Sequence, residues 1–557
     1  MLSATVLVGI GLALTSPLAP TSLVHPAGSP PVRCAAARLT AATTSTDDEA
    51  GWAEFEAWMT RKKEEEEQEA QEHGRPSWVV TSTGHQHDHF FSNSAQDWQS
   101  LGAPPRLIDN LAELGIARPS CAQAAAYESV ATGEDVIINH AAGTGKTLAF
   151  VAPLVQRLWE LEAEHGRTPK GEVRAIIIVP TAELAQQVLT TARDVARRSM
   201  RASIATGEHS WSTQRKRLGS GLDLLVATMG RLVAHCAPRD GKDPSFSLRG
   251  TRAIIVDEAD SLYQGEVPTW LQRKRIAHGD APAPSQQEPP LVMWRWLRGQ
   301  LAEEGAECAT TLVTASLSTS VEEQLRVDVG LGIRALRGRG VHTTRPGVRT
   351  RLVDCTVPLV VDDGHPSVFQ AKLDELLHAL DEVAEIDGRP PLRTLVLCSA
   401  AATCERLARA LHRQLAHYGV GGGRVLRFHS SLLPAQRAAS LDAFRAPASS
   451  DGDEPPRILI ATGRASKGLS FGEVGSLNAR GRDGVLGGDA DSDTGVKHVV
   501  LFDFPPDAKA HIARVGFATR GDAPAARVTA LAVGKQLPFA RAMLEQDKVG
   551  RAHGLDF

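Results

Sequence analysis

A glycine-rich stretch at residues 140–147, HAAGTGKT, has the residues of a loop that binds the phosphates of a nucleotide. It follows the apolar run DVIIN and precedes an apolar helical pattern, so we expect it between a strand and the start of a helix. Gly143 and Gly145 would let backbone N–H groups approach a polyphosphate closely. Lys146 would reach the terminal phosphates, and the Thr147 hydroxyl would face Mg²⁺. The alternative is a GTGKT sequence that arose by chance.

A second stretch, IIVDEAD at residues 254–260, reads as a buried strand that ends in carboxylates. Adjacent carboxylates raise the free energy of the folded chain unless a cation compensates their charges. Asp257 could hold Mg²⁺ through the water shell of the ion, and Glu258 could polarise an attacking water. An exposed acidic turn is the alternative for this stretch alone. Together with the glycine-rich loop, it predicts a site for a nucleoside triphosphate.

These residues must be positioned by the elements around them, and the chain contains two series of short apolar runs. Helix-length amphipathic segments separate the runs, and continuous β-branched runs of this kind are typical of parallel sheets covered on both faces. We therefore predict an α/β fold with two such sheets. The strands are expected at 135–139, 175–180, 222–228, 253–258 and 311–316, and then at 394–399, 425–430, 457–462, 498–504 and 527–533.

The composition limits the class of protein. A length of 557 residues predicts two to four domains. The formal net charge of −4 excludes a general polycation, so a nucleic acid would have to be held by a local groove. The 7 cysteines are scattered and form no CxxC pair, which argues against a disulfide framework and against a zinc module.

The first 97 residues differ in composition from the rest. Residues 1–46 contain no Asp or Glu and are rich in Ala, Ser, Thr and Pro, which is typical of an organelle transit peptide. We expect a plastid first and a mitochondrion second; a disordered N-terminus on a cytoplasmic or nuclear protein is the alternative. Residues 47–97 read as a charged extension and linker, including a loop with alternating histidines at 85, 87 and 89. Segments 262–300 and 472–496 lack a clear period and are interpreted as insertions.

From Trp98 to about residue 535, the sequence resembles the DEAD-box ATP-dependent RNA helicases of superfamily 2. The resemblance implies two tandem RecA-like domains, each a parallel sheet flanked by helices, behind a disordered N-terminal extension. These domains are expected at 98–335 and 350–540, with a linker at 336–349 and a short tail at 541–557.

The resemblance also implies how the nucleotide is bound. The segment from Trp98 to Gln123 is similar to the family's adenine-recognition segment, so the Gln123 amide would pair with the adenine edge and Trp98 would cover the ring. IATGRASKGLSF at 460–471 resembles the family's Ala-Thr-Asp-x-x-x-Arg-Gly-x-Asp, with Ser470 left to reach a ribose hydroxyl. The implied ATP-binding residues are Trp98, Gln123, Ala142, Gly143, Thr144, Gly145, Lys146, Thr147, Ser470 and Arg520.

Contacts with the RNA backbone follow from further similar segments. VPTAELAQQ resembles Pro-Thr-Arg-Glu-Leu-Ala with Ala182 in place of the arginine, and ATGEHS keeps only one of two glycines. ATMGRL resembles Thr-Pro-Gly-Arg, and FHSSLLPAQR resembles a His-Gly…Arg segment. The implied RNA-binding residues, which would contact RNA without reading its sequence, are Pro180, Thr181, Gly207, Thr228, Gly230, Arg231, Arg437 and Thr462.

HIARVGFATR at 511–520 resembles the family's His-Arg-x-Gly-Arg-x-x-Arg. Phe517 stands where the family has an arginine that faces the terminal phosphate, and an aromatic ring cannot donate hydrogen bonds to it. Arg520 is left as the implied arginine finger. The implied catalytic residues are Lys146, Thr147, Asp257, Glu258 and Arg520, with Thr147 and Asp257 holding Mg²⁺ through water. Coupling between the two domains is implied for Asp260, Thr314, Ser316 and Arg514.

The implied function is RNA-stimulated ATP hydrolysis, coupled to local unwinding of RNA duplexes or remodelling of ribonucleoproteins. It implies ATP and Mg²⁺ as cofactors, RNA and ribonucleoproteins as partners, a monomeric chain and no membrane. Because Gly463, Lys467, Ser470 and Phe517 depart from the family pattern, a degenerate relative that clamps ATP and RNA with little turnover stays open as an alternative. A relative that acts on DNA and an ATPase with another partner also stay open.

Overall fold

The computed structural model describes most of the chain after residue 95. The described residues are 79–80, 92, 96–141, 143–237, 243–263, 288–317, 319–330, 333–338, 341, 343–344, 348–357, 367–387, 393–417, 424–446, 457–463, 469, 496–518 and 527–548. The expected targeting peptide at 1–46, the alternating histidines and nearly all of the segment 472–496 lie outside them. No described helix is both long enough and apolar enough to cross a membrane.

The first sheet is fully parallel and has seven strands in the order β4-β5-β3-β6-β7-β2-β8. Its strands are β2 (Val136–Asn139), β3 (Val173–Val179), β4 (Ala202–Ala205), β5 (Leu222–Thr228), β6 (Ala253–Val256), β7 (Ala309–Thr314) and β8 (Arg334–Arg337). The strands β3 and β6 are buried along their whole length, and β5 is buried up to Thr228, as continuous β-branched runs predict. The expected α/β class is confirmed here.

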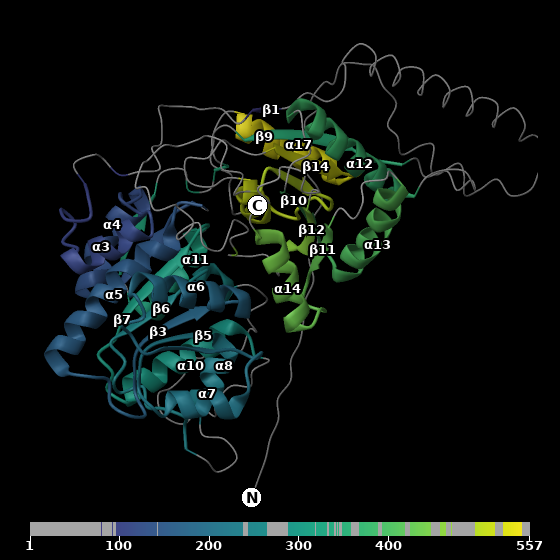
Figure 1. Cartoon of the computed structure of the whole chain (residues 1–557). Coiled ribbons are helices and arrows are strands. Elements are labelled where there is room, and N and C mark those ends of the chain that lie inside the picture. The colour runs from purple at the N-terminus through teal and green to yellow at the C-terminus, as the bar shows by residue number, and fades with distance from the viewer. Residues whose placement is uncertain are drawn as a thin grey trace, which may run out of the picture. The chain divides into compact units, whose positions relative to one another are not determined.

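Helices cover both faces of this sheet (Figure 1). On one face lie α3 (Pro105–Glu113), α4 (Cys121–Thr132), α5 (Lys146–His165) and α6 (Ala182–Val195), and on the other α8 (Met229–Cys236), α10 (Pro290–Glu303) and α11 (Thr319–Val329). Along β3, Ile177 packs with the first group, whereas Ile176 and Ile178 pack with the second. Successive strand residues point to opposite faces, so one apolar strand serves two cores.

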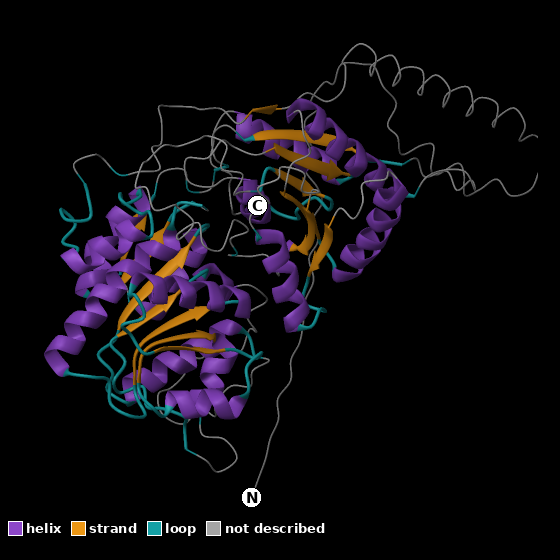
Figure 2. Cartoon of the chain, viewed as in Figure 1, coloured by secondary structure: helices purple, strands orange, loops and turns teal. Residues whose placement is uncertain are grey.

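The second sheet also has seven strands, in the order β1-β9-β14-β13-β10-β12-β11. These are β1 (Val79–Val80), β9 (Arg349–Asp354), β10 (Arg393–Cys398), β11 (Arg424–Phe428), β12 (Arg457–Thr462), β13 (His498–Leu501) and β14 (Arg527–Ala532). All neighbours are parallel except β1, which pairs antiparallel with β9. The sheet lies between helices, as Figure 2 shows. These are α12 (Val368–Asp387) and α13 (Ala401–His417), and opposite them α14 (Pro434–Arg445), α16 (Ala508–Val515) and α17 (Gln536–Lys548).

The structure corrects four sequence-based assignments. β1 lies in the expected linker at 47–97, and β8 crosses the expected domain boundary at 335. α17 crosses the boundary at 540 and lies beside β1, β9 and β14, so the second domain extends into the expected tail. The segment 262–300 is not simply an insertion, because α10 buries Trp294 and Trp296 in the core of the first domain. A two-residue strand, a four-residue strand that begins and ends in arginine, and two weakly amphipathic helices give little periodic signal, which explains these errors.

The C-terminal helix is fixed by a buried polar cluster. Asp547 of α17 accepts a hydrogen bond from the Thr344 hydroxyl, and its Oδ2 lies 3.2 Å from His511 Nε2 on α16. Asp547 and His511 are almost fully buried. The helix thereby joins the segment between the domains to α16.

Candidate active site

The glycine-rich loop connects β2 to α5 at the carboxyl edge of the first sheet. Gly143 and Gly145 have φ values of 74° and 80°, in the left-handed region that favours glycine. A Cβ on Gly145 would lie 2.5 Å from Gln123 Nε2, so the space beside the loop also requires glycine. Gly145 is the N-cap of α5, whose first N–H groups are available to an anion. Ala142 lies outside the described residues.

Lys146, the first residue of α5, is folded back over this loop. Its Nζ donates a hydrogen bond to Ala141 O at 2.9 Å. Burial lowers the pKa of the Lys146 ammonium. The carboxylates of Glu258, Asp257 and Asp260 act in the opposite direction, so all three lie within its field. A phosphate in the loop would give this ammonium a charged acceptor instead of a neutral carbonyl oxygen.

The two adjacent carboxylates follow β6 in a tight turn. Glu258 has a φ of 53°, which is uncommon for a residue with a side chain, and its N–H donates to Asp257 Oδ1 at 2.9 Å. Such a conformation costs roughly 1–3 kcal/mol and persists only where the surroundings hold it. Burial and the neighbouring Glu258 carboxylate raise the pKa of Asp257 to about 7. A hard divalent cation prefers carboxylate oxygens and would stabilise the ionised form, so this turn fits Mg²⁺.

Asp260 joins the two carboxylates to the end of β7 and to the second domain. The Thr314 hydroxyl lies 3.2 Å from Asp260 Oδ1, and Thr314 Oγ1 accepts a hydrogen bond from Ser316 N–H at 3.2 Å. Lys509 of α16 approaches Asp260 Oδ2 with its Nζ at 2.5 Å. The structure therefore brings together three of the residues expected to couple the domains. Sequence reasoning missed Lys509, whose only signal was its place on the helix that carries Arg514.

Gln123 lies against the glycine-rich loop, but Trp98 does not present its ring to a ligand. Gln123 Oε1 accepts from Ser120 N–H at 2.8 Å, and Nε2 donates to Gly145 O at 3.3 Å. This capping box was readable in the spacing SCAQ at 120–123. Trp98 is 2% exposed and donates from Nε1 to Ile116 O at 3.0 Å. Its expected contact with adenine is corrected to a place in the core.

The expected RNA contacts of the first domain lie after three neighbouring strands. Pro180 and Thr181 follow β3, Gly207 follows β4, and β5 ends in Thr228 at the start of α8. Because β4, β5 and β3 are adjacent in a parallel sheet, their carboxyl ends meet at one edge. The same edge carries the glycine-rich loop after β2 and the carboxylates after β6. Gly230 and Arg231 continue this surface in the first turn of α8.

Arg437 of the second domain is held by acidic residues of the first. It forms ion pairs with Glu183, on α6, and with Glu208, which directly follows Gly207. Arg437 Nη1 also donates to Leu432 O at 2.8 Å. An RNA phosphate would have to displace these carboxylates to reach Arg437. Glu208 is a second residue that sequence reasoning did not single out.

The departures at Gly463 and Phe517 have packing counterparts in the second domain. A Cβ on Gly463, next to the expected RNA contact Thr462, would lie 3.0 Å from Arg514 Nε. Arg514 donates to Asp503 O at 2.7 Å, and burial lowers its pKa. Phe517 packs partly buried against the core. Ser470 and Arg520 lie outside the described residues, so the implied ribose contact and arginine finger stay predictions.

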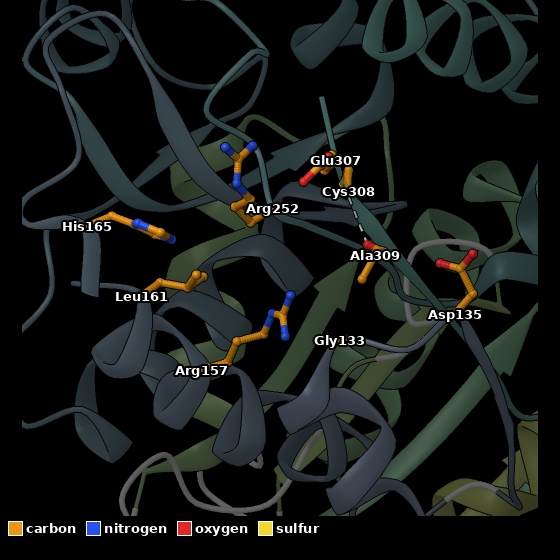
Figure 3. Close-up of a pocket in the computed structure, with 9 residues that line it drawn as sticks. All are labelled: Gly133, Asp135, Arg157, Leu161, His165, Arg252, Glu307, Cys308 and Ala309. Carbon is orange, nitrogen blue, oxygen red and sulfur yellow. Dashed lines mark hydrogen bonds between the residues drawn. The ribbon is translucent and has the colours of Figure 1, made fainter. Parts of the chain in front are cut away.

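A pocket of about 480 Å³ lies at the opposite ends of the strands of the first sheet from the glycine-rich loop (Figure 3). Its lining includes Asp135, Arg252 and Cys308, which directly precede β2, β6 and β7. These are the amino ends of the strands, whereas the glycine-rich loop and the acidic turn lie at the carboxyl ends. The pocket is therefore separate from the candidate site.

Comparison with known proteins agrees with this geometry. Residues 120–322 match the family model described as DEAD/DEAH box helicase. The chain is similar to "DEAD-box ATP-dependent RNA helicase 50" of Oryza sativa subsp. japonica, at 29% identity over 83% of this chain and 62% of the relative. The protein of that name from Arabidopsis thaliana is also 29% identical, over 83% of this chain and 51% of its own length. The chain thus spans between half and two thirds of the length of these relatives.

Solved structures agree in fold. Dbp5 of S. cerevisiae, bound to RNA and ADP BeF3, superposes with a TM-score of 0.58 at 16% identity, covering 82% of this chain and 94% of that one. The helicase Mss116, bound to ssRNA and UDP-BeF, gives a TM-score of 0.60 at 16% identity, covering 82% and 78%. At this identity the likeness establishes the tandem RecA-like fold and leaves the chemistry to the residues themselves.

Proposed function

We propose that this chain is a DEAD-box ATP-dependent RNA helicase of superfamily 2, because residues 120–322 match the DEAD/DEAH box helicase model and the chain is similar to proteins named as DEAD-box ATP-dependent RNA helicases. It would hydrolyse ATP in response to RNA and use the cycle to unwind short duplexes or remodel ribonucleoproteins. The observation that supports this most is the field around Lys146, where a half-buried ammonium beside the glycine-rich loop lies in the field of Asp257, Glu258 and Asp260. A loop for phosphates and an acidic turn for a cation are the two parts that a triphosphate needs.

Each part of the site would have a separate role in hydrolysis. The loop from Gly143 to Gly145 would surround the phosphates with backbone N–H groups, and Lys146 would neutralise their terminal charge. Thr147 and Asp257 would hold Mg²⁺, which supplies a positive charge that stabilises the phosphate oxygens. Glu258, kept in its turn by the hydrogen bond to Asp257, would orient and polarise the attacking water.

RNA would lie along the carboxyl ends of β3, β5 and β4 and be held by its sugar–phosphate backbone. Several of the expected contacts there are backbone groups and hydroxyls, which bind phosphates without reading bases. The charge of −4 on the whole chain fits a local contact of this kind. In the second domain, Arg437 and Thr462 would complete the contact.

The test is phosphate release by the full chain, with and without single-stranded RNA, in the wild type and in Glu258→Gln. We expect RNA to stimulate release and the variant to lose about 10²-fold or more of that rate. Glu303→Gln, the same change at an exposed position of α10, is the matched control and should leave the rate unchanged. A wild-type rate that RNA does not raise above the Glu258→Gln rate would contradict turnover. Tight RNA binding in that case would favour the non-hydrolysing clamp.

We also propose an organellar location, with a plastid before a mitochondrion, and a role in RNA processing there. The support is the composition of residues 1–46, which lack Asp and Glu. Fusing these residues to a fluorescent protein should direct it to the organelle. A diffuse cytosolic signal would contradict the proposal.

A further inference from the structure

A single buried glutamine joins three parts of the first domain's RNA surface. Gln214 lies on α7 (Trp211–Leu218) and is 2% exposed. Its Nε2 donates to Thr206 O at 2.9 Å and to His209 O at 2.7 Å, the two ends of the loop that contains Gly207. Its Oε1 accepts from Arg231 Nε at 3.2 Å. One side chain therefore holds both the loop after β4 and the first turn of α8.

The remaining bond of Gln214 fixes the proton on a histidine. Because two carbonyl oxygens take the amide N–H groups, Oε1 must face His235 Nε2, which lies 3.0 Å away. His235 therefore carries its proton on Nε2, and its Nδ1 accepts from Ser245 Oγ at 2.9 Å. Burial, with Arg231 and Arg215 nearby, lowers the pKa of His235 to about 4, so the ring is neutral at pH 7. All four hydrogen-bonding positions of the Gln214 amide are occupied.

Arg231 is held on three sides by this arrangement. Besides its bond to Gln214, its Nη2 donates to His209 O at 2.8 Å. Its guanidinium carbon lies 5.0 Å from the centre of the Trp211 ring, which in turn stacks on His235 at 3.9 Å and 8°. A long arginine side chain would otherwise lose much rotamer entropy when it binds a phosphate. Here that entropy is already lost before the ligand arrives.

We propose that Gln214 is a positioning residue that holds Arg231 and the loop at 206–209 as one preformed unit for the RNA sugar–phosphate backbone. This inference rests on the proposed function, because it assumes that Arg231 contacts RNA. Gln214 acts through Arg231 and touches no ligand itself. If Gln214 only stabilised the domain, replacing Gln214 and replacing Arg231 would affect RNA affinity independently of each other.

The experiment is a double-mutant cycle on the full chain. A fluorescein-labelled oligouridine of ten nucleotides reports RNA affinity by fluorescence anisotropy in the presence of a non-hydrolysable ATP analogue. We expect Gln214→Leu and Arg231→Ala each to weaken RNA binding by about tenfold, the size typical of coupled neighbours. The two together should lose little more than either alone. Arg231→Ala should also lower the salt dependence by about 0.7 in log–log slope, as expected for one lost phosphate contact on a single strand.

Two further variants separate positioning from stability. His235→Phe keeps a ring for Trp211 but removes the donor to Gln214, so a smaller loss of RNA affinity is expected from it. Gln300→Leu, on α10, removes the hydrogen bond to Glu303 and should leave RNA affinity unchanged. Melting temperatures and the ATPase rate without RNA are recorded for each variant. If Gln214→Leu proves unfolded, the cycle is closed with His235→Phe instead.

The outcomes are distinct. Losses that simply add in the double variant overturn the inference, and so does an Arg231→Ala chain that binds RNA like the wild type. Neither result touches the proposed helicase function. A wild-type chain that binds no RNA would overturn the proposed function and the inference with it.

Discussion

At the scale of single residues, the acidic turn after β6 concentrates both charge and strain. Asp257 is 5% exposed, and Glu258 sits next to it in a left-handed conformation. Without a cation, this arrangement favours a proton on the Asp257 carboxyl. In the nucleotide-free protein, the acidic turn should therefore lower the free energy of unfolding.

The first prediction concerns pH. The pKa of Asp257 is raised from its ordinary 3.8 to about 7 in the folded chain. A raised carboxyl pKa means that the folded state binds more protons, so its stability contribution is present below about pH 4 and is lost as pH rises through 7. A tenfold change in the acid dissociation constant corresponds to about 1.4 kcal/mol. Between pH 5 and pH 7.5, the free energy of unfolding measured in urea should fall less in Asp257→Asn than in the wild type. Equal declines would contradict the raised pKa.

The second prediction concerns Phe517, which packs partly buried against the core of the second domain. Phe517→Arg should lower the free energy of unfolding by about 1 kcal/mol, because a half-buried ring is lost. It should also raise the RNA-stimulated kcat, because it restores a cation where the family faces the terminal phosphate. Phe517→Leu is the control for packing alone. An unchanged kcat in the arginine variant would show that this position lies away from the phosphate.

At the scale of elements, the glycine-rich loop depends on backbone conformation more than on side chains. We predict that Gly145→Ala weakens binding of a fluorescent ATP analogue by about tenfold, because a left-handed residue with a Cβ costs roughly 1–2 kcal/mol. The new Cβ would also meet Gln123 Nε2 at 2.5 Å.

Gly299→Ala is the matched control, since Gly299 lies within α10 and its added Cβ would meet no atom within 4 Å apart from the adjoining backbone of its own helix. It should leave nucleotide affinity unchanged and stabilise the chain by about 0.5–1 kcal/mol. Similar nucleotide affinities in the two glycine variants would contradict the role of the loop. Fluorescence titration and urea unfolding measure the two effects.

The elements also show what the sequence could predict. The ten expected strands all exist, because β-branched runs buried on both faces leave a clear pattern. β1, β4, β8 and β9 were not expected: β1 has two residues, β4 is the short run ASIA, and β8 and β9 each contain two arginines. The positions of site residues followed from strand ends. Which side chains are buried could not be predicted in this way. The core position of Trp98 and the cluster around Gln214 therefore became visible only in the structure.

At the scale of the whole molecule, Asp260 links the acidic turn after β6 to α16. Lys509 approaches it with Nζ 2.5 Å from Oδ2, and the Asp260 side chain is 1% exposed. A buried carboxylate is costly without its partner. The ion pair therefore favours the arrangement in which the two domains meet.

The prediction at this scale is that Lys509→Ala lowers the RNA-stimulated ATPase rate by about fivefold or more, the usual size of coupling between sites. The rate without RNA should change much less, because Lys509 does not belong to the phosphate loop or the acidic turn. Lys535→Ala, at an exposed position of the second domain that is not part of this pair, is the control. Equal loss of the stimulated and unstimulated rates would assign Lys509 to chemistry instead of coupling.

The pairing of β1 with β9 has a consequence for how the chain is put together. Residues 79–80 precede the first domain in sequence but extend the sheet of the second. In topological terms, the first domain is therefore an insertion within the second, and the second is assembled from two separate stretches of chain. During synthesis the first domain is complete once residue 338 has emerged, whereas Val79 and Val80 must wait for β9 to follow. Among the described strands, the one that is synthesised first is thus one of the later ones to pair.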